Sequence, residues 1–194
     1  MRRLITRNCI ALAVLLTLSA MGYGVYRRHY PYGHTHRCDR VLYMGLCRYA
    51  HEHDGWFPRG AATPEESLML LVKQFDEYAG TIVDKRIPDS EMKEIVGHRE
   101  KLKPEVCGWH YVEGSREDDD HRLALFWDKA GLGHNGERLA GGGHIVCFVG
   151  CNFEHIPAAR WEEFLEEQRR LRAALNRPTR DPLNPGPPLV PVRK

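Results

Sequence analysis

The sequence lacks the excess of positive charge that a nucleic-acid-binding surface needs. Its 194 residues include 28 Lys and Arg and 26 Asp and Glu, a formal net charge of +2. Five of the basic residues fall within the first 28 residues, where there is no acid. The rest of the chain has 23 bases against 26 acids, a balance of −3 with histidine neutral. Because phosphate contacts need clustered cations, this composition excludes nucleic acid as a partner.

The sequence also lacks the motifs of common catalytic and metal sites. It has 11 histidines and six cysteines, but no His-Glu-x-x-His and no Cys-x2-Cys. No serine stands in a Gly-x-Ser-x-Gly motif. Glycines 141–143 precede no expected helix, so they do not form a phosphate cradle. We therefore predict no catalytic residue, no cofactor and no metal ligand.

Three consecutive aspartates, Asp118, Asp119 and Asp120, stand in an expected loop. Carboxylate oxygens are the ligands that calcium prefers, which makes this run the best calcium candidate in the chain. A solvated charge run is the favoured interpretation. A membrane-tethered metal-binding module or hydrolase that uses the His- and Asp-rich loops is the alternative function that the sequence leaves open.

A long uncharged segment follows a basic N-terminus (residues 1–8). Residues 9–26 contain no charge and lie between Arg7 and the pair Arg27-Arg28. As a helix, these 18 residues extend about 27 Å, which nearly spans a hydrocarbon core. Two other interpretations are a secretory signal cleaved near Ala20-Met21-Gly22 and a buried helix of a soluble protein. The favoured interpretation is a retained transmembrane anchor.

The next part of the chain predicts a hinge and then helices. Pro31 and Gly33 interrupt residues 27–36, so we expect a short hinge there. Apolar residues at helical intervals predict an amphipathic helix over residues 38–53. A capping box with proline at the first helical position predicts a helix from residue 64 to about residue 80, and a weaker helix begins at residue 89.

From residue 107 the hydrophobic period shortens to that of strands. Short aromatic or β-branched runs, separated by Gly or Asp clusters, predict a small antiparallel sheet. They occupy residues 108–113, 123–127, 143–149 and 152–156. Residues 158–176 have a helical apolar stripe with acids first and arginines last, which complements the helix dipole. Residues 177–194 hold six prolines and predict a disordered tail.

The last two expected strands are close enough to form a hairpin. A two-residue loop at Gly150-Cys151 would be of type II′, which requires a positive φ at Gly150. That loop places Val149 opposite Asn152 and Phe148 opposite Phe153, as an aromatic pair on one face. It also places Cys147 opposite Glu154.

The cysteines are expected to be packed thiols. Cys38 and Cys47 on one helix would be about 13 Å apart along its axis, too far for a disulfide. A bond from either of them to Cys107 is the alternative that the sequence leaves open.

Two stretches together resemble bacterial pilin-like and pseudopilin-like proteins. Residues 37–58 (RCDRVLYMGLCRYAHEHDGWFP) resemble the helix that follows the membrane segment in that family. Residues 141–157 (GGGHIVCFVGCNFEHIP) resemble the terminal hairpin of the subgroup named for a histidine, nine residues and then Asp-Gly. Residues 111–114 (YVEG) and 125–129 (LFWDK) resemble that subgroup's middle strands, so the match covers residues 37–165.

The resemblance implies a pilin-like α+β domain over residues 37–176, with an amphipathic helix packed on a small antiparallel sheet and a C-terminal helix. It implies a structural or interaction role, in a secretion-type or pilus-type assembly, and no enzyme activity. We therefore expect a single-pass protein of the cell inner membrane with its main domain outside the cytoplasm. The expected partners are the lipid bilayer and either further copies of the chain or other envelope proteins.

Overall fold

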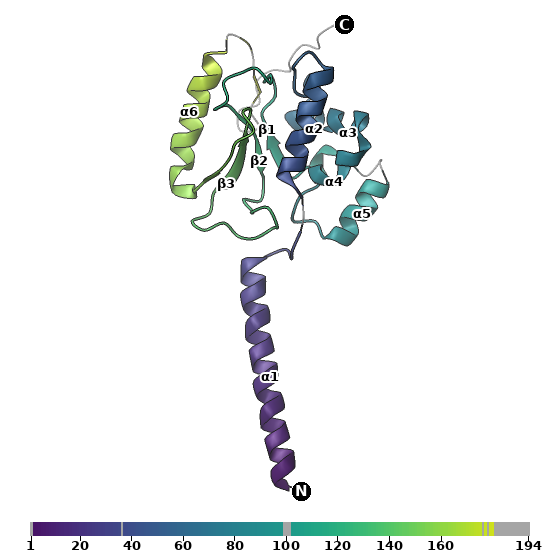
Figure 1. Cartoon of the computed structure of the whole chain (residues 1–194), viewed down its shortest axis with the longest axis vertical. Helices are drawn as coiled ribbons and strands as arrows, with labels where there is room; N and C mark the ends of the chain where they lie inside the picture. Colours follow the sequence, from purple (N-terminus) through teal and green to yellow (C-terminus); the bar gives the residue numbers. More distant parts are fainter. Residues whose placement is uncertain (1, 36, 99–101, 176, 178, 181–194) are drawn as a thin grey trace.

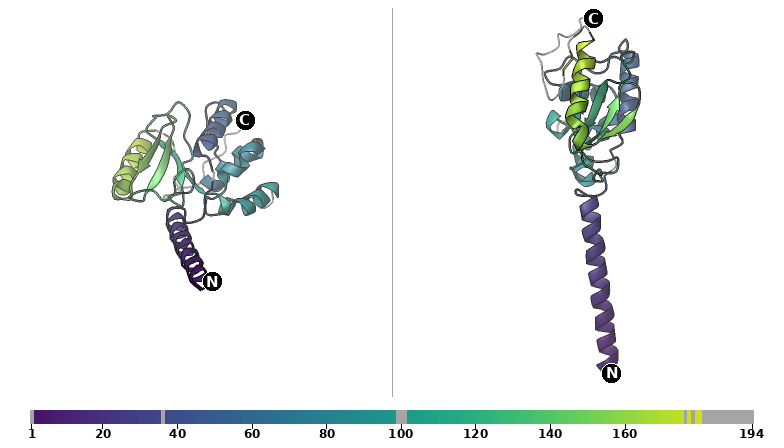
Figure 2. Two further views of the ribbon diagram at one scale, coloured as in Figure 1. Left: turned by 60° about the horizontal axis from the view of Figure 1, so that its bottom comes forward. Right: turned by 90° about the vertical axis from the view of Figure 1, so that its left-hand side faces the viewer.

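The computed structural model describes residues 2–35, 37–98, 102–175, 177, 179 and 180, with only the backbone for residues 2–9. A long helix, α1 (Arg2–His29), projects from a folded head (Figures 1 and 2). Residues 30–38, which we call the linker, contain no helix or strand in the described part. The expected α+β class and the break after the apolar helix are confirmed, although α1 extends three residues into the segment expected to be the hinge.

The apolar helix has length and composition suited to crossing a membrane. Its segment Ile10–His29 has a mean hydropathy of 1.4, and none of that window is buried in the protein. These 20 residues rise about 30 Å, close to the thickness of a hydrocarbon core. The interpretation as a buried helix of a soluble protein is therefore wrong. The basic side chains expected in residues 1–8 lie outside the described part.

A four-stranded antiparallel sheet lies at the centre of the head, in the order β1-β2-β3-β4. All four expected strands are confirmed. Their bounds are β1 (Trp109–Tyr111), β2 (Ala124–Asp128), β3 (His144–Phe148) and β4 (Phe153–Ile156). The strand order equals the chain order because each pair of neighbours is antiparallel and needs no crossover.

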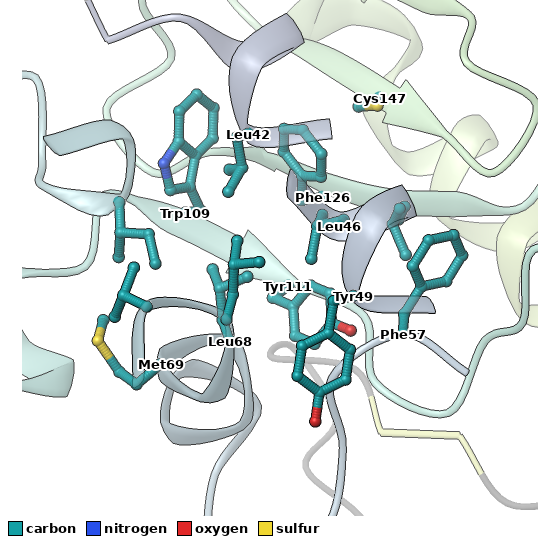
Figure 3. Close-up of a cluster of buried hydrophobic side chains, with 14 of the residues drawn as sticks. Leu42, Leu46, Tyr49, Phe57, Leu68, Met69, Trp109, Tyr111, Phe126 and Cys147 are labelled. Atoms are coloured by element: carbon teal, nitrogen blue, oxygen red, sulfur yellow. The ribbon is translucent and has the colours of Figure 1, made fainter. Parts of the chain in front are cut away.

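One face of the sheet packs against the helices that follow the linker. The expected amphipathic helix is present as α2 (Asp39–Glu52), and its fully buried Leu42 and Leu46 meet the sheet residues Tyr111 and Phe126 in one apolar cluster (Figure 3). The helix α3 (Pro64–Gln74) supplies Leu68 to the same cluster. Burial of this shared apolar surface holds the helices on the sheet.

The start of α3 follows the sequence prediction, but its end does not. Thr63 caps the helix by accepting a hydrogen bond from Glu66 N at 3.1 Å. The α-helix ends at Gln74, and a 3-10 turn (Asp76–Tyr78) leads to the short α4 (Ala79–Ile82). The bend brings the ring of Tyr78 against Gly45 of α2, where a Cβ would lie only 2.9 Å from that ring. This tertiary contact overrides the local helical pattern. The weaker helix is confirmed as α5 (Asp89–Gly97).

The C-terminal helix covers the opposite face of the sheet. After a 3-10 turn (Ala158–Arg160), α6 (Trp161–Ala173) packs Phe164 and Leu165 on a second cluster that contains Trp127 and Val146. Figure 2 shows the sheet between α6 on one side and the helices α2 to α5 on the other. The head therefore has three layers, helix, sheet and helix, and both sheet faces are buried.

The hairpin between β3 and β4 differs from the prediction by one residue. Cys147, not Phe148, pairs with Phe153, and Phe148 N donates to Asn152 O at 2.9 Å across a three-residue loop. The positive φ falls on Cys151, at 61°, and not on Gly150. The predicted pairing of Cys147 with Glu154 is also wrong, because Glu154 pairs with Val146.

Contacts of the loop explain the register. Val149 N donates to Leu123 O at 2.9 Å, and Tyr43 Oη donates to Val149 O at 2.7 Å, so Val149 is not available to pair with Asn152. A shift of one residue moves side chains to opposite faces. Phe148 accordingly packs on α6, whereas Phe153 packs towards Tyr43 of α2.

This register makes a prediction for Cys151. A β-branched side chain is strained in the left-handed region. We therefore expect the free energy of unfolding of Cys151→Val to be about 1 kcal/mol lower than that of Cys151→Gly. Urea denaturation of the two variants side by side measures this difference. Equal stabilities would contradict the three-residue loop and restore the predicted positive φ at Gly150.

The segment predicted to be a tail contributes to the head. Arg180 is buried and forms an ion pair with Glu113, and the backbones of these two residues are paired by two hydrogen bonds of 2.9 Å. Arg177 Nε donates to Gly114 O at 3.1 Å. The predicted boundary at residue 177 is therefore wrong, because the cationic side chains find buried acceptors. The part of the predicted tail after residue 180 lies outside the described residues.

Candidate functional site

The loop of residues 133–138 bonds both to the linker and to the end of α1. Gly133 N donates to Glu137 O at 2.7 Å, which closes the loop. Arg138 N donates to His29 O, the last residue of α1, at 2.8 Å. Thr35 N in the linker donates to Asn135 O at 3.1 Å. We call this contact region, where α1 meets the head, the junction.

Three potential metal-ligating side chains meet at the junction. Cys38 and Asp39 stand at the start of α2, and His134 lies in the loop. His134 Nδ1 and Asp39 Oδ1 are 2.8 Å apart, and the ligand atoms of all three side chains lie within 4.8 Å of one another. Asp39 is buried, whereas Cys38 and His134 are partly exposed. Among the described residues this is the one such group of His, Cys, Asp and Glu side chains.

The donor atoms of this group suit a borderline-soft cation. A thiolate, an imidazole nitrogen and a carboxylate oxygen are the three ligand types that zinc takes from proteins. Three protein ligands also leave a fourth coordination position open. These residues form no ligand motif in the sequence, because local spacing does not reveal a contact between positions 95 residues apart.

Two buried cations near the junction are neutralised by partners of their own. Arg37 is buried, forms an ion pair with Asp89 and donates to Ile87 O at 2.8 Å. Lys85 Nζ donates to Gly133 O at 3.0 Å and lies 3.5 Å from a carboxylate oxygen of Asp128. These contacts hold the loop and the end of the linker in place. They also limit the electrostatic repulsion that an added cation meets.

Burial and ion pairing act in opposite directions on the pKa of the Asp128 carboxyl. Burial raises its pKa above the ordinary value, and the nearby Lys85 ammonium opposes that rise. Asp128 Oδ1 accepts from Leu132 N at 3.1 Å, at the entry to the loop. Asp128 therefore has a structural role in positioning the loop that carries His134.

The aspartate run predicted as a calcium candidate is paired with arginines. Arg116 Nε lies 2.8 Å from Asp118, and Arg122 Nη2 lies 2.7 Å from Asp120. The hydrogen bond from Arg122 lowers the pKa of Asp120 to about 2, and that from Arg116 lowers the pKa of Asp118. Asp119 pairs with Arg177. A calcium ion would have to displace these guanidinium groups, so the arrangement favours the interpretation as a charge run.

The other thiols have different environments. The described cysteines are all free, so the alternative of a disulfide to Cys107 is wrong. The expectation of packed thiols is confirmed for the buried Cys107 and Cys147, whereas Cys151 is exposed. Burial raises the pKa of Cys107 to about 12 and raises the pKa values of Cys47 and Cys147 as well. Thiols held in the protonated form are poor nucleophiles and poor ligands. The side chain of Cys9 lies outside the described part.

Three other histidines, which the alternative metal-binding function would use, bond to other polar groups. His53 Nε2 lies 2.8 Å from Gln74 Oε1, and His155 Nε2 lies 2.8 Å from Gly142 O. His144 Nδ1 lies 2.7 Å from Asp128 O. Among the described histidines, His134 is thus the one that belongs to a group of three potential ligand side chains.

Comparison with family models, curated proteins and solved structures found no match to this chain.

Proposed function

We propose that this protein is a single-pass component of the cell inner membrane whose head lies outside the cytoplasm and makes structural contacts with other proteins. The observation that carries the proposal is α1. Its segment Ile10–His29 is apolar, long enough to cross a bilayer and entirely unburied. A helix of that kind leaves a large apolar surface in water unless lipid or protein covers it.

The second part of the proposal concerns the outward face of α2. Met44 is 64% exposed and Val41 is 37% exposed, so two apolar side chains, one turn apart, face away from the core. An apolar patch on a helix surface is a common element of protein interfaces. In the pilin-like proteins that residues 37–58 resemble, the domain after the membrane helix belongs to an envelope assembly, which agrees with this assignment.

The proposed assembly differs from a pilus built by standard processing. The membrane segment opens Asn8-Cys9-Ile10 and has none of the glycine-led Phe-Thr-Leu-Ile-Glu sequence of prepilins. The linker also separates α1 from α2, so the two do not form one continuous helix. The proposal therefore includes contacts through the head and does not include cleavage by a prepilin peptidase.

Photo-crosslinking of the intact protein in its own membranes tests the interaction role. A photoreactive amino acid in place of Met44 should give adducts larger than the monomer, whereas the same group at the exposed Glu163 of α6 should give few. Adducts of twice the monomer mass would identify self-association, and other masses would identify a different envelope protein. Monomer alone from both positions would contradict a contact role for α2.

A further inference from the structure

We infer that Cys38, Asp39 and His134 form a zinc-binding site that joins the linker to the head. The inference does not depend on the proposed function, because the three residues belong to the junction whether or not α1 lies in a bilayer. The three side chains supply a sulfur, an oxygen and a nitrogen ligand from two chain segments. This combination matches the ligand preferences of zinc better than those of calcium or magnesium, which take oxygen ligands.

The distances are compatible with a tetrahedral ion after small side-chain movements. Zinc bonds of 2.0–2.3 Å place neighbouring ligand atoms about 3.3–3.8 Å apart in a tetrahedron. The ligand atoms of the three side chains all lie within 4.8 Å of one another, and His134 Nδ1 and Asp39 Oδ1 are 2.8 Å apart. Zinc would replace the hydrogen bond between His134 Nδ1 and Asp39 Oδ1, and the Cys38 thiol would bind the ion as a thiolate, with the displaced protons released to solvent. The partial exposure of Cys38 and His134 gives their side chains room for this adjustment.

The position of the site indicates what zinc would do. Cys38 is the last residue of the linker, and Asp39 is the first residue of α2. His134 lies in the loop whose neighbouring residues bond to Thr35 in the linker and to His29 at the end of α1. A zinc ion would therefore cross-link the start of α2 to the loop that holds α1. It would restrict how the head moves relative to α1, and the fourth position would take water or a ligand from a partner.

Metal titration of the full-length protein in detergent micelles tests the site. After removal of bound metal with a chelator, the unmodified protein should bind one zinc ion per chain. Cobalt in the same site should give a sulfur-to-metal charge-transfer band in the near ultraviolet, since Cys38 is the sulfur ligand. Cys38→Ser should abolish the band, and both Cys38→Ser and His134→Gln should weaken binding more than ~10-fold, the range seen even for residues that only support ligands.

Matched controls separate this site from adventitious binding. Cys47→Ser removes the partly buried cysteine of α2, and His51→Gln removes an exposed histidine of the same helix. Both controls should keep the band and the affinity. Cys38 makes no side-chain capping hydrogen bond in α2, so Cys38→Ser should keep the fold, which circular dichroism verifies.

Several results would overturn the inference: no zinc bound to the unmodified protein, binding unchanged in Cys38→Ser or in His134→Gln, or equal losses in the controls. The cross-linking role has its own readout. Zinc should slow hydrogen exchange at the amides of Thr35 and Arg138, which bond across the junction. Zinc binding with unchanged exchange at both amides would contradict that role.

Discussion

Glu113→Ala is expected to lower the free energy of unfolding of the head by about 3–5 kcal/mol. Glu113 and Arg180 are both almost completely buried, and Arg180 Nε lies 2.8 Å from Glu113 Oε2. The guanidinium also donates to Ala61 O at 2.6 Å and to Ala62 O at 2.8 Å. Removing the carboxylate leaves a buried positive charge with only carbonyl acceptors. The loss comes mainly from that uncompensated charge.

Denaturant unfolding of the full-length protein in detergent measures the effect of Glu113→Ala. A chain truncated after residue 176 should lose stability as well, because the truncation removes Arg180. The matched control is Asp120→Ala, which breaks the exposed pair with Arg122. Solvent screens that pair, so its loss should leave the midpoint nearly unchanged. If Glu113→Ala behaved like Asp120→Ala, the docking of the segment around Arg180 on the head would be wrong.

The double variant Leu16→Arg, Leu18→Arg is expected to release the protein from the membrane. Both leucine side chains are about 60% exposed on α1, and the unmodified helix has no charged side chain between residues 10 and 26. An arginine near the centre of a membrane helix is unfavourable by about 2.5–3.5 kcal/mol on the insertion scale. The mean hydropathy of the segment Ile10–His29 is only 1.4, so two such charges should exceed what the helix gains in lipid.

Fractionation of cells that express the double variant measures its release. The conservative variant Leu16→Val, Leu18→Val is the control and should stay with the membranes. The head should keep its fold in both variants, because no described side chain of α1 belongs to either apolar cluster. Retention of the arginine variant in the membrane fraction would mean that something other than α1 holds the protein there.

Local patterns predicted the elements of this fold well. The capping box at Thr63 and Glu66 acts within one turn of helix, and the continuous apolar run of β2 reflects burial on both sheet faces. Signals of this kind arise between residues that are close in the sequence, so a single sequence is enough to reveal them. The same holds for α1, because the uncharged run in the sequence is enough to predict an apolar helix.

Contacts between distant residues were not predictable from the same patterns. The hairpin register depends on a hydrogen bond from Tyr43 to Val149, 106 residues away. The helix after Thr63 ends at Gln74, and the bend that follows brings Tyr78 against Gly45. The group of Cys38, Asp39 and His134 likewise exists only after the loop has folded onto the linker. Such features require the tertiary structure because no local spacing encodes them.

The central claim is that α1 holds the folded head at a membrane. Extraction of isolated membranes with alkaline carbonate tests it most directly, since carbonate releases peripheral proteins and leaves membrane-spanning ones in the pellet. The account predicts that the unmodified protein stays in the pellet, with residues 1–29 still attached when its N-terminus is sequenced. Recovery in the supernatant, or an N-terminus beyond Ala20, would contradict the account.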